Sequence, residues 1–119
     1  MTNNAPPNET IPVIHSLCEL YKQIYLLTPK IQKRDRFGIY LKVELFCIEL
    51  LNLLISAAFE SRHLKINTLI DARVKIEVLK RFIRLLYELK IIELRKYTDF
   101  ESRLQEISKM TNGWIRYLQ

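Results

Sequence analysis

Residues 43–59 have the sequence VELFCIELLNLLISAAF, the most apolar stretch of the chain. At about 100° per residue, a helix through this region carries apolar side chains over about 200° of its circumference. A helix on a protein surface has an apolar arc about half as wide, so this helix must be covered on more than one side. It does not cross a membrane, because a spanning helix needs about 20 predominantly apolar residues. The polar residues that interrupt it are Glu44, Glu49, Asn52 and Ser56.

Hydrophobic spacing outward from this stretch predicts four helical segments. Pro29 ends the first segment, because the residue before a proline avoids the helical backbone conformation. The third segment repeats the broad apolar arc of the second. The predicted segments are residues 11–27, 35–63 and 67–92, and a fourth that begins near residue 98.

The fourth segment carries two further signals. Thr98, with Glu101 three residues later, is a predicted capping box at the helix start. Gly113 lies inside the predicted helix, where glycine costs up to about 1 kcal/mol relative to alanine. We therefore expect another backbone to approach closely there, and we assign Gly113 and Trp114 to packing.

Four helices with short connections are typical of an antiparallel up-down four-helix bundle, so the predicted fold class is all-α. We expect the bundle domain to cover residues 10–119, after a flexible N-terminal lead over residues 1–9. One bundle core cannot cover apolar arcs of about 200° on both central helices. The sequence therefore predicts a second interface and a homo-oligomer.

Composition excludes several classes of protein. Only two of the 119 residues are glycine, which argues against phosphate-binding glycine loops and hairpin-rich sheets. Two cysteines, Cys18 and Cys47, are too few for a disulfide scaffold or a four-thiolate zinc site. Buried thiols and the lack of a targeting signal in residues 1–10 predict a cytoplasmic protein.

No set of residues predicts catalysis. His15 and His63 lie in separate segments, and neither has a second His or Cys at metal-ligand spacing. Glu77 is surrounded by basic residues, which favours an ion-pair network over a general base. We expect no enzyme activity, no cofactor and no metal site.

The basic residues carry the functional signal. Lys and Arg number 19 against 13 Asp and Glu, a formal charge of +6 that indicates an anionic partner. One cluster lies between the first two predicted helices and the other along one face of the third. Both suit phosphate contacts that do not depend on base sequence. The predicted nucleic-acid-binding residues are Lys30, Lys33, Arg34, Arg36, Arg73, Lys80, Arg81 and Arg84.

Other interpretations of these features stay open. A solvated loop explains the first cluster equally well, and both clusters could dock an acidic protein surface. Four tyrosines could stack on bases, although core packing is the favoured interpretation. They are Tyr21, Tyr25, Tyr40 and Tyr87.

Three short motifs resemble a known family. They are YLLTPKI at residues 25–31, KRDRFG at 33–38 and NGWIRYL at 112–118. This order of features resembles the accessory variability determinants (Avd) of diversity-generating retroelements. The features are a helix that ends at proline, a basic patch, a long apolar second helix and a closing Gly-Trp-Ile segment. A sister branch is the four-helix bundle protein encoded in intervening sequences of large ribosomal RNA genes. The resemblance covers about residues 11–119.

The resemblance implies a non-catalytic homopentamer, a tapered barrel with a basic exterior and a central channel. It implies binding to a reverse transcriptase and its structured template RNA, in support of mutagenic cDNA synthesis. Phosphate contacts of this kind could also bind DNA. The chain lacks a basic extension after Gln119, so the cations named above are expected to carry the contact alone. The rival is an interaction module of the ribosomal intervening-sequence type that docks an acidic protein partner.

Overall fold

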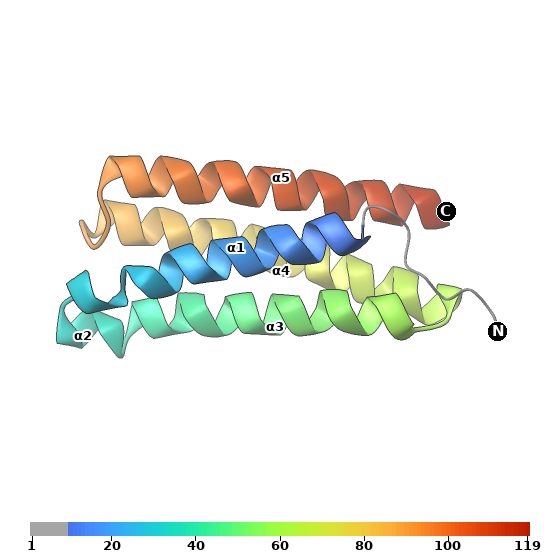
Figure 1. Ribbon diagram of the computed structural model, residues 1–119, viewed down its shortest axis with the longest axis horizontal. Helices are drawn as coiled ribbons and strands as arrows, with labels where there is room; N and C mark the ends of the chain where they lie inside the picture. Colours follow the sequence, from blue (N-terminus) through green and yellow to red (C-terminus); the bar gives the residue numbers. More distant parts are fainter. Residues whose placement is uncertain (1–9) are drawn as a thin grey trace.

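The computed structural model describes residues 10–119, so the predicted flexible lead over residues 1–9 lies outside the described part. The predicted all-α class is confirmed there, with four long helices, one short helix and one 3₁₀ turn (Figure 1). In chain order the elements are α1 (Thr10–Leu26), the 3₁₀ turn η1 (Thr28–Lys30), α2 (Lys33–Arg36), α3 (Ile39–Phe59), α4 (Arg62–Glu88) and α5 (Leu94–Leu118).

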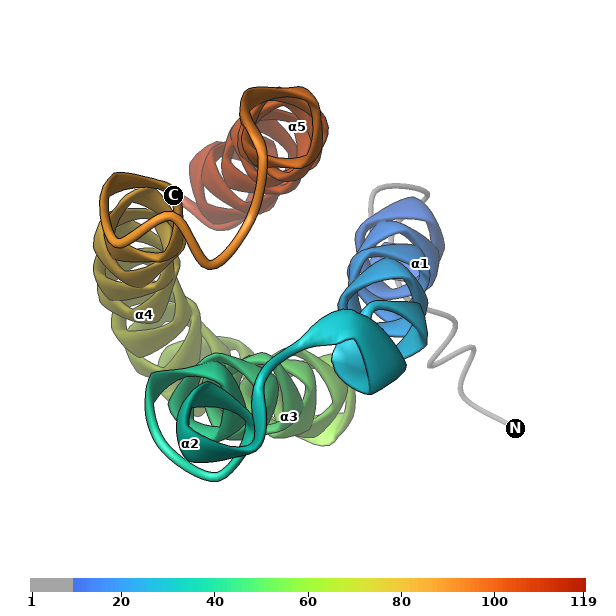
Figure 2. The ribbon, with the colours of Figure 1, turned by 90° about the vertical axis from the view of Figure 1, so that its left-hand side faces the viewer.

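The four long helices form an antiparallel bundle. Each runs opposite to the long helix before it, and α1 and α4 both pack against α3 and α5 (Figures 1 and 2). The connections α1–α3 and α4–α5 therefore lie at one end of the bundle, and the connection α3–α4 lies at the other. At that other end, the Arg62 guanidinium donates a hydrogen bond to the carbonyl oxygen of Leu118 and joins α4 to the end of α5.

The core receives side chains from every long helix. Leu17, Leu50, Ile76 and Trp114 are fully buried, which confirms the packing role predicted for Trp114. The Tyr40 hydroxyl donates a hydrogen bond to the backbone carbonyl of Ile24 and ties α3 to α1. Buried apolar side chains from all four long helices therefore form one continuous core.

The close backbone approach predicted at Gly113 is wrong. A Cβ at this position would meet only the Arg116 side chain, at 3.8 Å. The glycine instead fills a position of α5 that has room for alanine. The crowded glycine is Gly38, where a Cβ would lie 3.0 Å from the backbone oxygen of Arg34.

The second predicted segment, 35–63, is divided in the structure. α2 ends at Arg36, and α3 starts only after Phe37 and Gly38. The Gly38 amide donates to the Asp35 carbonyl at 3.1 Å, which closes the α2 turn before the new helix begins. Apolar spacing continues through this break, so hydrophobic periodicity did not reveal it.

Three boundaries of the last two helices also differ from the prediction. α4 covers residues 62–88 rather than 67–92, and α5 begins at Leu94 rather than near residue 98. The Thr98 hydroxyl donates to the Leu94 carbonyl at 2.8 Å inside α5, so the predicted capping box is wrong. Glu93 precedes the helix instead, without a side-chain cap.

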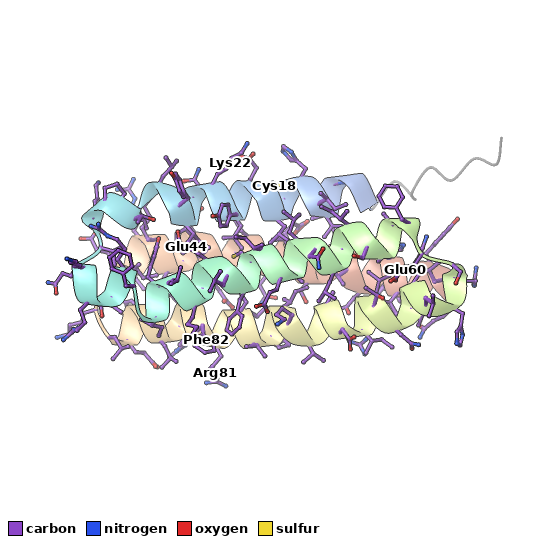
Figure 3. The ribbon with its side chains drawn as sticks, turned by 90° about the horizontal axis from the view of Figure 1, so that it is seen from below. Cys18, Lys22, Glu44, Glu60, Arg81 and Phe82 are labelled. Atoms are coloured by element: carbon purple, nitrogen blue, oxygen red, sulfur yellow. The ribbon has the colours of Figure 1, made fainter. Side chains whose placement is uncertain are left out.

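The outward sides of α3 and α4 keep apolar side chains that the bundle does not cover. Figure 3 is a view from below, in which α3 lies between α1 and α4. On α3, four of these side chains are 37% to 47% exposed at spacings of three, four and seven residues: Leu41, Leu45, Ile48 and Ile55. On α4, Val74 is 58% exposed. Within residues 10–119, no helix has both the length and the apolar character that a membrane crossing requires.

Candidate nucleic-acid interface

The structure places the eight predicted cations in two regions. Four lie in and around η1 and α2, at the end of the bundle that also holds the α4–α5 connection (Figure 2). We call residues 28–38 and 89–96 together the loop end. The other four form what we call the α4 stripe: Arg73, Lys80, Arg81 and Arg84.

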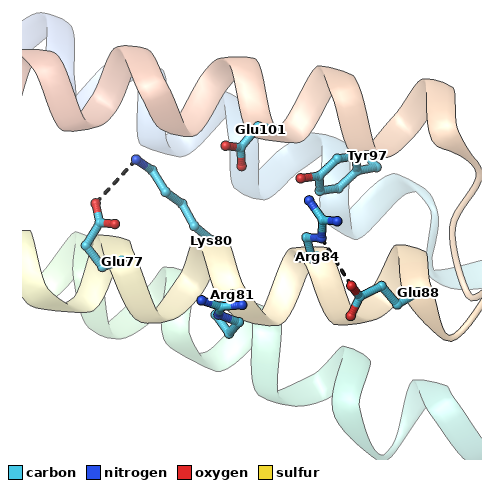
Figure 4. A pocket seen from close by; sticks show the side chains of 7 residues that line it. All are labelled: Glu77, Lys80, Arg81, Arg84, Glu88, Tyr97 and Glu101. Carbon is cyan, nitrogen blue, oxygen red and sulfur yellow. Dashed lines mark hydrogen bonds and ion pairs between the residues drawn. The ribbon is translucent and has the colours of Figure 1, made fainter.

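Carboxylates neutralise much of the α4 stripe. The Lys80 ammonium lies 3.3 Å from a Glu77 oxygen, and Arg84 Nε lies 3.2 Å from a Glu88 oxygen (Figure 4). The hydrogen bond to Glu88, with a smaller contribution from Tyr97, raises the pKa of the Arg84 guanidinium. The Arg84–Glu88 pair is exposed and is worth at most about 1 kcal/mol, whereas the Lys80 side chain is only 17% exposed. Both pairs engage cations that phosphate would need.

A shallow hollow between α4 and α5 has balanced charge. Three cations and three carboxylates line it together with one tyrosine: Glu77, Lys80, Arg81, Arg84, Glu88, Tyr97 and Glu101. Figure 4 shows Glu101 and Tyr97 on α5 facing the α4 side chains. Within residues 10–119, Arg73 and Arg81 are the stripe members without an ion pair. The stripe is therefore less basic than its sequence indicates.

The first connection is built around one buried side chain. Ile31 is 5% exposed, and its amide donates to the Thr28 carbonyl at 3.0 Å, so the 3₁₀ turn seals the end of the core. Lys30 and Lys33 are exposed on either side of it. Arg36 is different, since it is half-buried and donates a hydrogen bond to the Ile31 carbonyl at 3.0 Å. Arg36 thus holds the connection in place.

The second connection contains a lysine that sequence reasoning did not select. The Lys90 amide donates to the Tyr87 carbonyl at 2.9 Å, and the Ile91 amide donates to the Leu86 carbonyl at 2.8 Å. This pair of hydrogen bonds defines a Schellman turn, in which the residue just after the helix takes a left-handed backbone conformation. That residue is Lys90, whose φ is 62°. Glycine usually occupies that position. Because lysine occupies it here, the turn had no local indication in the sequence.

Other titratable groups have structural explanations. Burial raises the pKa of the Cys47 thiol to about 12, so it stays protonated and unreactive. Burial also raises the pKa of Glu44, and a hydrogen bond of 3.3 Å from the Thr28 hydroxyl partly opposes this. No three His, Cys, Asp or Glu side chains of the described chain come together as a metal site.

The tyrosines divide into two groups. Tyr40 is fully buried, and Tyr87 stacks on Tyr97 with ring centroids 5.1 Å apart. Tyr25 is 59% exposed, so the prediction that it packs in the core is wrong. Its ring lies 6.3 Å from that of half-buried Tyr21 on the outside of α1.

The fold and its surface define an all-α bundle protein with a basic end. The sequence model of the bAvd-like family matches residues 13–118, nearly the whole bundle, and the chain therefore belongs to the bAvd-like family. Membership suggests an accessory variability determinant, from a family that is not known as catalytic. Comparison with curated proteins and with solved structures finds no significant match.

Proposed function

We propose that this protein is a non-catalytic accessory protein of a diversity-generating retroelement. It binds the reverse transcriptase and the structured template RNA, and it supports mutagenic cDNA synthesis. The observation that carries this proposal is the family match over residues 13–118. The formal charge of +6 supports it, because such a surface attracts nucleic acid of any sequence, DNA included.

The proposed assembly is a homopentamer built through the outer face of α3. Support comes from the four exposed aliphatic side chains on that face, which follow a helical stripe. Covering apolar surface gains about 25 cal/mol per Å², so a second copy is a favourable cover for this stripe. The loop end lies at one end of the bundle, whereas this stripe follows α3, so we expect the loop-end cations to stay accessible in such an assembly.

Light scattering on the purified protein, with and without a structured RNA at two salt concentrations, tests the proposal. We expect a mass of several chains and an RNA complex that dissociates as salt rises. Co-purification with the reverse transcriptase completes the test. A 14.3 kDa monomer that ignores RNA would remove the proposed function. Loss of an acidic protein partner on charge reversal, without RNA binding, would instead favour an interaction module.

The assembly has its own variant. Ile48→Glu places a charge on the outer face of α3, where Ile48 is 47% exposed. We expect the mass to fall toward 14.3 kDa while the circular dichroism of the helices is kept. Ser102→Glu, an exposed position on α5, is the matched control and should leave the mass unchanged. An unchanged mass for Ile48→Glu would contradict assembly through this face.

A further inference from the structure

Two hollows at the loop end share a common wall. The first is lined by both connections: Lys30, Ile31, Gln32, Arg34, Asp35, Leu89, Lys90 and Ile91. The second adjoins it and is lined by Leu27, Lys30, Ile31, Ile91, Ile92, Glu93 and Lys96. Lys30, Ile31 and Ile91 belong to both. Segments about 60 residues apart in the chain thus line adjoining hollows. Both connections lie at the same end of the bundle (Figure 2).

Almost the whole net charge of the protein lies at this end. Residues 28–38 and 89–96 contain seven Lys and Arg against two carboxylates, Asp35 and Glu93, for a formal charge of +5. The whole chain has 19 Lys and Arg against 13 Asp and Glu. All other residues together therefore contain 12 basic and 11 acidic side chains, a formal charge of +1. The net charge is therefore concentrated in these two segments, and four of their seven cations line the hollows: Lys30, Arg34, Lys90 and Lys96.

These cations are also less neutralised than those of the α4 stripe. Of the seven, only Arg34 forms an ion pair in the described chain, a single contact of 3.4 Å to Asp35 by a side chain that is 85% exposed. The Arg36 guanidinium donates a hydrogen bond to the Ile31 carbonyl oxygen. Within residues 10–119 the other five have no carboxylate partner: Lys30, Lys33, Lys90, Arg95 and Lys96. Bringing them together is repulsive, and a bound anion would relieve that repulsion.

Lys90 gives a second, independent indication. A left-handed backbone is unfavourable for a residue with a Cβ, and glycine commonly takes this position of a Schellman turn. The strained residue lines the first hollow with Lys30 and Arg34. Lysine accepts at this position a strain that glycine would avoid, which makes its side chain a candidate for a binding role.

We infer that the loop end, and not the α4 stripe, is the main phosphate-binding site, and that Lys90 is one of its binding residues. This inference rests on the proposed function, and its ligand is the phosphodiester backbone of RNA. Ammonium groups from two connections would contact neighbouring phosphates as point charges, with Ile31 and Ile91 as an apolar floor. Contacts between lysine and phosphate carry no base information, so we expect binding that does not depend on sequence.

The test compares two variants of equal charge. The loop-end variant is Lys30→Gln, Lys90→Gln and Lys96→Gln, and the control is Arg73→Gln, Arg81→Gln and Lys109→Gln on α4 and α5. Fluorescence anisotropy with a labelled RNA hairpin over a salt series gives the affinity and its salt dependence. We expect the loop-end variant to lose about tenfold or more in affinity and two to three units of salt slope. The control should lose less than half as much.

Lys90→Gly separates a binding role from a structural one. Glycine relieves the left-handed strain, so we expect a melting temperature that is unchanged or higher by about 3–5 °C. We expect the salt slope to fall by about one unit. A cation at this position also complements the negative end of the α4 dipole. If that were its only role, the variant would melt earlier and bind RNA as the original protein does.

The outcomes separate this inference from the proposed function. If the original protein binds no RNA hairpin, the proposed function fails with it. If the original protein binds RNA, and the loop-end variant binds equally well or the α4–α5 control loses more, only the assignment to the loop end is overturned. Lys90→Arg keeps the charge, so it should keep the affinity within about twofold.

Discussion

The two sides of α3 are both apolar, yet only one is buried by the rest of the chain. The inner side has relative exposures of 0% to 1%: Val43, Cys47, Leu50 and Leu54. The outer side has exposures of 37% to 47%: Leu41, Leu45, Ile48 and Ile55. Residue type therefore does not decide which side faces the core. Contact with α1 and α4 decides it, and the outer side is left uncovered by the rest of the described chain.

The strongest test of this difference removes one side chain from each side. Leu50→Ala leaves a cavity among fully buried neighbours, so we expect a loss of about 2–5 kcal/mol in the free energy of unfolding. Ile48→Ala, its matched control, should cost less than about 1 kcal/mol in dilute protein, where the outer side meets water. Urea unfolding followed by circular dichroism measures both. Equal losses would show that the two sides are equally well packed.

The second test concerns the turn that starts α3. Gly38→Ala would place a Cβ 3.0 Å from the Arg34 carbonyl oxygen, so α2 and the start of α3 must shift. We expect a loss of about 1 kcal/mol in stability, because the obstacle is backbone. Gly113→Ala has room in α5 and should gain up to about 1 kcal/mol. The melting temperatures of the two variants should therefore shift in opposite directions. A shift of both in the same direction would contradict the geometry.

The smallest effect concerns Glu44, which lies beside the inner side of α3. Burial raises the pKa of Glu44 above its usual 4.5 in the folded protein, so the fold favours the protonated form. The ionised form therefore costs stability, a cost that is absent below pH 4.5 and grows as pH rises toward the folded pKa. Glu44→Gln should be slightly more stable than the original protein at pH 7 and equal to it near pH 4. Melting temperatures across this range check the trend, which a constant difference would contradict.

The sequence predicted the helical bundle well because apolar spacing and Pro29 are local signals. It did not predict the break at Gly38, since the apolar pattern continues from one helix into the next. It missed Lys90 because the turn there uses lysine where a glycine would have marked it. The basic residues were visible in the sequence. Their neutralisation on α4, and the meeting of residues 28–38 with 89–96, depend on tertiary structure.

The position of the charge also affects how several copies would act together. A molecule with +5 at one end and a nearly neutral remainder is electrically polarised along its long axis, and it approaches an anion with that end first. In a ring with rotational symmetry, every subunit directs the same end to the same side. The loop ends of the proposed assembly would then form one basic rim that holds a single RNA at several points. Such multivalency converts modest contacts into strong avidity, while each contact can still exchange quickly.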